Sequence, residues 1–198
     1  MTDSVDQDSL AQKGIQSEDQ EIQAYITVPD GSYTKDGELT FTLTAQEYKT
    51  FPVSPVVTQG IYKCELKVNK LGNFNFGVMK SGLVIPFGMN GNQYPYFKDC
   101  MFFHSNGSLY QNHKTPAGNQ QIKEGDVAAI EVNLAEPKTA HLFINDVQQP
   151  VYMSGIPDKV QFFFNINFPG ESVTVLSLRK LNVPNAKNIS GEIEIKWQ

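Results

Sequence analysis

Histidines and cysteines carry most nucleophilic and metal chemistry, and this chain has few of either. Its histidines are His104, His113 and His141, and its cysteines are Cys64 and Cys100. None of them stand at a zinc-ligand spacing such as Cys-x2-Cys or His-x3-His. Both cysteines lie in apolar runs, which favours buried free thiols with a raised pKa. We therefore expect no metal, no cofactor and no thiol nucleophile. A disulfide, or a Cys–His pair that meets only in space, stays open.

Two glutamates, Glu65 and Glu131, are the candidates for carboxylate chemistry. Paired carboxylates hydrolyse glycosides, and sandwich folds host such enzymes. Each glutamate, however, lies in an alternating run that places it on the polar face of a strand, where we expect it to be solvated. The sequence also has no phosphate loop, nucleophile elbow or dinucleotide fingerprint. We predict that the chain is not an enzyme, with a glycoside hydrolase as the weaker alternative.

Aromatic side chains gather in a segment rich in glycine and asparagine, residues 86–95, which we interpret as a loop. A second expected loop follows Pro150. Adaptable loops that carry aromatic side chains on a rigid scaffold are typical of recognition surfaces. We therefore predict four ligand-binding residues on these loops: Met89, Tyr94, Tyr96 and Tyr152. The alternative for Met89, Tyr94 and Tyr96 is that they fill core beneath a long loop.

Alternation of apolar and polar residues predicts the strands that would position these loops. It is clearest in residues 61–68, 127–134 and 160–168, and no helical pattern competes with it. Within the last run, Phe162, Phe164 and Ile166 share the face that we expect to be buried, with Gln161, Asn165 and Asn167 on the other. Further strands are expected at residues 24–28, 38–43 and 192–197. Residues 51–55 contain two prolines and are expected to be a loop.

Turn residues separate these short strands at the spacing of a sandwich or barrel. The sequence thus predicts an all-β fold, a two-sheet antiparallel β-sandwich. Residues 1–22 are acidic and polar, with too little apolar surface to offset the entropy of ordering. We predict a disordered N-terminal tail over 1–22 and one domain over 23–198.

Charge and hydropathy limit the partners. The net charge is −5, and the 16 lysines and arginines are scattered along the chain, so nucleic acid is not expected as a partner. The N-terminus lacks the apolar stretch of a secretory signal, and no run is long enough to span a membrane. We expect a cytoplasmic protein, with the nucleus as an alternative, that is neither secreted nor membrane-bound. The oligomeric state is not fixed by the sequence, and we expect a monomer.

Five pieces of sequence between residues 60 and 178 resemble a SPRY domain in their order and spacing. They are the early strand at 60–68, the Gly-Val strand at 76–82, the hairpin at 103–112, the Gly-Asp-Val strand from 125 and the Phe-x-x-Asn turn at 142–146. Tyr62 and Phe103 stand where the family usually has tryptophan, and Asp146 where it has glycine. The chain therefore resembles a divergent member.

This resemblance implies a concanavalin-like or jelly-roll sandwich of SPRY type. It also implies a non-catalytic module that recognises a protein or short peptide through loops at one end of the sandwich. SPRY modules commonly serve as adaptors or substrate receptors, including in ubiquitin ligation. The alternative is a lectin-like, carbohydrate-binding sandwich, because asparagine, glycine and aromatic loop residues also suit sugars.

Overall fold

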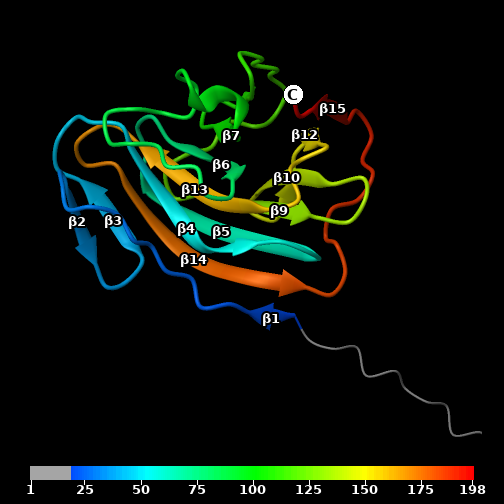
Figure 1. Cartoon of the computed structure of the whole chain (residues 1–198), viewed down its shortest axis with the longest axis horizontal. Helices are drawn as coiled ribbons and strands as arrows, with labels where there is room; N and C mark the ends of the chain where they lie inside the picture. The colour runs from blue at the N-terminus through cyan, green and yellow to red at the C-terminus, as the bar shows by residue number, and fades with distance from the viewer. Residues whose placement is uncertain (1–18) are drawn as a thin grey trace, which may run out of the picture.

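The structure, a computed structural model, describes residues 19–198 and arranges them as two β-sheets packed face to face (Figure 1). Ten strands form the larger sheet: β1 (Gln20–Glu21), β2 (Tyr33–Asp36), β3 (Thr40–Leu43), β5 (Ile61–Lys70), β9 (Val127–Asn133), β10 (Thr139–Ile144), β11 (Val147–Gln148), β12 (Val151–Ser154), β14 (Ser172–Leu181) and β15 (Ile193–Lys196). Five form the smaller sheet: β4 (Lys49–Val57), β6 (Asn75–Lys80), β7 (Cys100–His104), β8 (Leu109–Tyr110) and β13 (Val160–Ile166). Among the described residues the one helical segment is a 3-10 turn, η1 (Tyr96–Lys98).

The strand orders are β15-β12-β10-β9-β5-β14-β3-β2 and β4-β13-β6-β7-β8, with β1 on β14 and β11 on β10. All pairings are antiparallel except β12 with β15, which is parallel. The predicted all-β, two-sheet sandwich is confirmed. The strand expected at residues 192–197 is present as β15, at the edge of the larger sheet as predicted.

The main core lies between the two sheets, where the alternating runs meet. Phe162, Phe164 and Ile166 of β13 are all fully buried in it, so the predicted register of this strand is confirmed. Phe164 stacks on Phe51 of β4, with ring centroids 4.9 Å apart and an interplanar angle of 13°. Phe41 of β3 reaches across from the larger sheet, with its ring centroid 4.9 Å from that of Phe51 and 6.1 Å from that of Phe164. Aromatic contacts of this kind bury large apolar areas and hold the two sheets together.

The outer face of the smaller sheet is also covered, which the alternation did not predict. Residues 81–99 connect β6 to β7 and lie over this face, where a second apolar cluster forms. Its buried members are Met79, Ile85, Cys100, Phe102 and Phe163. Asn165, predicted to lie on the polar side of β13, is also buried and only 1% exposed. It donates to Thr50 Oγ1 at 3.3 Å and accepts from Asn75 Nδ2 at 3.2 Å.

Two local predictions were wrong. Residues 51–55, expected to be a loop, belong to β4, because β4 is the edge strand of its sheet and an edge tolerates prolines. Residues 24–28, expected to be a strand, make only an isolated bridge in which Tyr25 and Ser54 exchange backbone hydrogen bonds.

The N-terminal segment joins the fold at the larger sheet. Gln20 and Glu21 pair with Lys180 and Arg179 of β14, and the Ile22 amide donates to the Leu178 carbonyl at 2.8 Å. The last residues of the segment 1–22, predicted to be a tail, therefore lie along a strand. Residues 1–18 lie outside the described part of the chain. Within residues 19–198 no helix is long and apolar enough to cross a membrane.

Candidate functional site

The segment 81–99 carries three of the four predicted ligand-binding residues. Met89 and Tyr96 are half-buried and pack against the apolar cluster on the outer face of the smaller sheet. Tyr94 is 81% exposed and contacts Phe97, with ring centroids 6.5 Å apart. Met89 and Tyr96 thus fix the segment to the sheet, and Tyr94 is the one of the three that faces solvent.

Tyr152 lies elsewhere. It belongs to β12, and not to the loop in which the sequence placed it. Its neighbours Val151 and Met153 point into the main core, so Tyr152 points to the outer face of the larger sheet. There it stacks on His141, with ring centroids 4.5 Å apart and an interplanar angle of 11°. Tyr152 and the segment 81–99 are therefore on opposite faces of the sandwich.

A largely apolar groove that opens to solvent lies on the outer face of the smaller sheet. It has a volume of about 470 Å³, within the usual range of roughly 300–1,000 Å³ for ligand sites. We call it the apolar groove, and it is lined by Thr27, Val28, Pro29, Thr50, Pro52, Met79, Leu83, Val84, Ile85, Pro86 and Phe87. Residues 27–29 form one wall and residues 83–87 the other, with β4 and β6 beneath.

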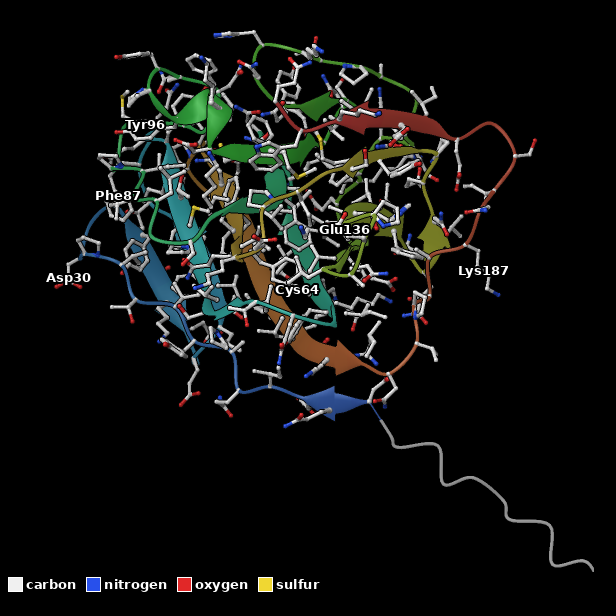
Figure 2. All side chains as sticks on the ribbon, turned by 45° about the vertical axis from the view of Figure 1, so that its right-hand side comes forward. Asp30, Cys64, Phe87, Tyr96, Glu136 and Lys187 are labelled. Carbon is white, nitrogen blue, oxygen red and sulfur yellow. The ribbon has the colours of Figure 1, made fainter. Side chains whose placement is uncertain are left out.

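The wall 83–87 is anchored from below and presents apolar surface above. Ile85 is buried in the cluster on the sheet, whereas Val84 is 77% exposed. The Gly88 amide donates to the Tyr48 carbonyl at 2.8 Å, which holds the end of the wall to the start of β4. Figure 2 shows Phe87 on the same side of the molecule as Asp30, which follows the opposite wall. The groove is thus built on supported backbone.

Polar groups are few in the apolar groove. Pro29, Pro52 and Pro86 have no backbone N–H to donate. Thr27 and Thr50 supply the hydroxyls of the lining, and Thr50 already accepts a hydrogen bond from Asn165. The groove is therefore suited to apolar side chains more than to pairing with an extended backbone.

The two glutamates considered for carboxylate chemistry lie on the outer face of the larger sheet, and the expectation that they are solvated was wrong. Glu131 is 1% exposed, and its two oxygens accept from the amides of Asn185 and Ala186, each at 3.0 Å. The C-terminal segment that follows β14 folds back over Glu131, which is why the strand pattern alone misplaced it.

Glu65 is similarly committed. Its oxygens lie 3.0 Å from Lys63 Nζ and 3.0 Å from Arg179 Nη2, and Ser177 Oγ donates to it at 2.7 Å. Burial raises the pKa of Glu65, but the Ser177 hydrogen bond and the two cations outweigh burial and hold the pKa below its ordinary value. All four oxygens of Glu65 and Glu131 therefore have protein partners, which is the arrangement of structural ion pairs and caps.

Both cysteines are buried free thiols, as predicted. Burial raises the pKa of both, that of Cys100 to about 12. A thiol in this state is protonated at neutral pH and is a poor nucleophile. Among residues 19–198, no three His, Cys, Asp or Glu side chains are grouped closely enough to hold a metal ion.

Comparison with known proteins identifies the fold. No protein-family model and no curated protein matches the sequence. Among solved structures, the SPRY domain of human HERC1 is similar at 15% identity and a TM-score of 0.57, over 78% of this chain and 96% of that domain. A second human SPRY domain is similar at 16% identity and a TM-score of 0.58, over 78% of this chain and 98% of that domain. The TRIM65 PSpry domain is similar at 10% identity and a TM-score of 0.58, over 77% of this chain and 88% of that domain.

At these identities the likeness shows the fold alone. The chain therefore has the SPRY fold in a divergent form, which confirms the resemblance seen in its sequence.

None of the four ligand-binding residues predicted from the sequence lines the apolar groove. The signal that could have found one wall is the run Leu83 to Phe87, five successive apolar residues between Gly82 and Gly88 that belong to no alternating pattern. No comparable signal marks Pro29, Pro52 or Met79. Pro52 and Met79 meet because β4 and β6 flank β13 in the sheet, and Pro29 belongs to the segment that Tyr25 joins to Ser54 of β4.

Proposed function

We propose that this chain is a protein-recognition module that binds an apolar peptide segment in the apolar groove. The observation that carries the proposal is a solvent-open, largely apolar groove of about 470 Å³ whose wall 83–87 is held by a buried cluster beneath it. Exposed apolar surface on a supported scaffold is costly to leave in water and is typical of interaction sites. The SPRY fold agrees with a binding role but does not by itself establish one.

The chemistry of the groove favours a ligand with two or more large apolar side chains. Val84 and its neighbours offer apolar contact, and the prolines offer no donors for backbone pairing. Binding energy in such sites concentrates in a few buried anchors. A module with this property suits an adaptor or substrate receptor, which brings a bound protein to a second one.

The test uses a phage-displayed library of linear peptides selected on the wild-type chain. Peptides that bind should carry closely spaced apolar residues. Val84→Asp should weaken them at least tenfold, because it places an unpaired carboxylate in the groove. Val183→Asp is the matched control, since Val183 is 69% exposed and lies outside the groove. Selection of no peptide, or equal binding by both variants, would contradict the proposal.

A further inference from the structure

Lys49 is an unusual residue for its position beside the apolar groove. It begins β4, and its side chain is only 1% exposed. Lysine is almost never fully buried unless its charge is paired, because an ammonium loses its hydration on burial. The surroundings of this ammonium therefore decide what the residue does.

Three segments meet at the Lys49 ammonium. Its Nζ lies 3.4 Å from the centroid of the Phe87 ring, well within the range of a cation–π contact. It also lies 2.9 Å from Glu47 Oε2, and that oxygen accepts from Ser32 Oγ at 2.7 Å. Gly31 approaches so closely that a Cβ there would stand 2.6 Å from Nζ.

These contacts join the two walls of the groove. Phe87 is the last residue of the wall 83–87, and Gly31 and Ser32 follow the wall 27–29 after one intervening residue, Asp30. A cation held between a carboxylate and an aromatic face fixes both the position and the tilt of the ring. A neutral side chain of the same length would fill the space but would attract neither group.

We propose that Lys49 is the positioning residue of the apolar groove: its buried ammonium, held between Phe87 and Glu47, fixes the wall 83–87 against the segment 29–32 and so sets the shape that a ligand meets. The part of this inference that concerns ligand binding rests on the proposed function. The contact of Lys49 with Phe87 and Glu47, which we call the clamp, is a property of the free protein and is tested without a ligand.

The first measurement is amide hydrogen exchange in Lys49→Met, which keeps an unbranched side chain of nearly the same length and removes the charge. The reporter is the Gly88 amide, because it ties the end of the wall to Tyr48. We expect Gly88 to exchange at least tenfold faster, while core amides of β13 keep wild-type protection. Unchanged exchange at Gly88 would overturn the clamp.

The matched control is Lys63→Met in the other sheet. The Lys63 side chain is 6% exposed, its Nζ pairs with Glu65 at 3.0 Å and Asp146 at 3.2 Å, and it lies 5.3 Å from the Phe143 ring centroid. It thus loses the same charge from a similar environment far from the groove. Equal acceleration of Gly88 in both variants would mean general loosening and would overturn the inference.

Phe87 variants test whether the aromatic face matters. Phe87→Tyr keeps the ring and should leave Gly88 exchange near that of the wild type. Phe87→Leu keeps an apolar side chain without a π face and should behave like Lys49→Met. The double variant Lys49→Met/Phe87→Leu should exchange no faster than either single one, because both remove the same contact. Wild-type exchange in Phe87→Leu would show that packing alone holds the wall.

A final binding measurement separates the inference from the proposed function. A peptide selected on the wild-type chain and weakened by Val84→Asp should bind Lys49→Met at least tenfold more weakly and Lys63→Met normally. Normal binding by Lys49→Met would refute the positioning role while the groove remained the binding site. If no peptide depends on Val84, the proposed function fails, and the exchange data would then describe a clamp without a binding role.

Discussion

Lys63 Nζ donates to Asp146 Oδ1 at 3.2 Å and so ties β5 to the turn between β10 and β11. Asp146 has a φ of 64°, in the left-handed region where a Cβ is strained. A glycine would adopt this conformation freely, and Asp146 stands where the SPRY resemblance places the family's usual glycine. The carboxylate of Asp146 is 86% exposed, so its ion pair with Lys63 is screened by water.

Substitutions of Asp146 compare the destabilising backbone strain at this position with the stabilising ion pair to Lys63. Asp146→Gly should leave the free energy of unfolding unchanged or raise it by up to about 1 kcal/mol, because relief of strain outweighs a screened pair. Asp146→Ala should lower it by about 1 kcal/mol, because the strain remains and the pair is lost. Urea denaturation measures both. A glycine variant less stable than the alanine variant would show that the contact with Lys63 dominates.

Phe164→Ala tests the core between the sheets. Phe164 is fully buried and stacks on Phe51, so its truncation should cost about 3–5 kcal/mol. Phe168→Ala is the control, because Phe168 lies just beyond β13 and is 41% exposed. The control should cost clearly less in the same denaturant titration. A loss under about 1 kcal/mol for Phe164→Ala would be incompatible with a packed core there.

Truncation of Tyr94 and of Tyr96 should affect stability differently, because Tyr94 is exposed and Tyr96 packs against the sheet. Tyr94→Ala should change stability by about 0.5 kcal/mol or less, because the side chain is exposed. Tyr96→Ala should lower it by about 1–3 kcal/mol, because the ring packs on the cluster beneath the segment 81–99. Thermal melts measure both effects.

The contribution of Tyr94 to binding stays a prediction and needs its own measurement. Truncation of one interface anchor typically costs more than 1 kcal/mol. A folded Tyr94→Ala variant should therefore bind a selected peptide several-fold more weakly. Unchanged affinity would place the binding energy entirely within the apolar groove.

Two histidines should make stability depend on pH. Burial lowers the pKa of His104 and of His141 below the ordinary value of 6.5. Below pH 6.5 the unfolded chain therefore binds protons that the folded chain does not, and the free energy of unfolding should fall as pH falls. His104→Gln and His141→Gln should each flatten this slope between pH 7.5 and about pH 5.5.

His113→Gln is the matched control for that experiment, because the His113 side chain is exposed. Denaturant titrations at several pH values give the slope directly. A slope that keeps its wild-type value in both His104→Gln and His141→Gln would contradict the predicted effect of burial on these two imidazoles.

The sequence by itself determined many of the strands and most of their inward faces. The alternation in residues 61–68 placed Tyr62, Cys64 and Leu66 correctly in the core, and the same rule worked for β13. This succeeds because a strand turns successive side chains to opposite faces, whatever its neighbours are. The order of five sequence pieces also identified the SPRY fold.

Only the tertiary structure decided which outward faces are covered and which loops meet. Glu131 is buried because residues 185–186 return to it, and Phe163 because residues 81–99 cover the outer face of its sheet. Tyr152 lies in β12 of the larger sheet, away from Tyr94 on the other side of the sandwich. The apolar groove brings residues 27–29 next to residues 83–87. Alternation is a local property of the chain, whereas the covering of a sheet face depends on segments far away in sequence. The residue pattern within a strand therefore cannot predict which segment covers its outer face.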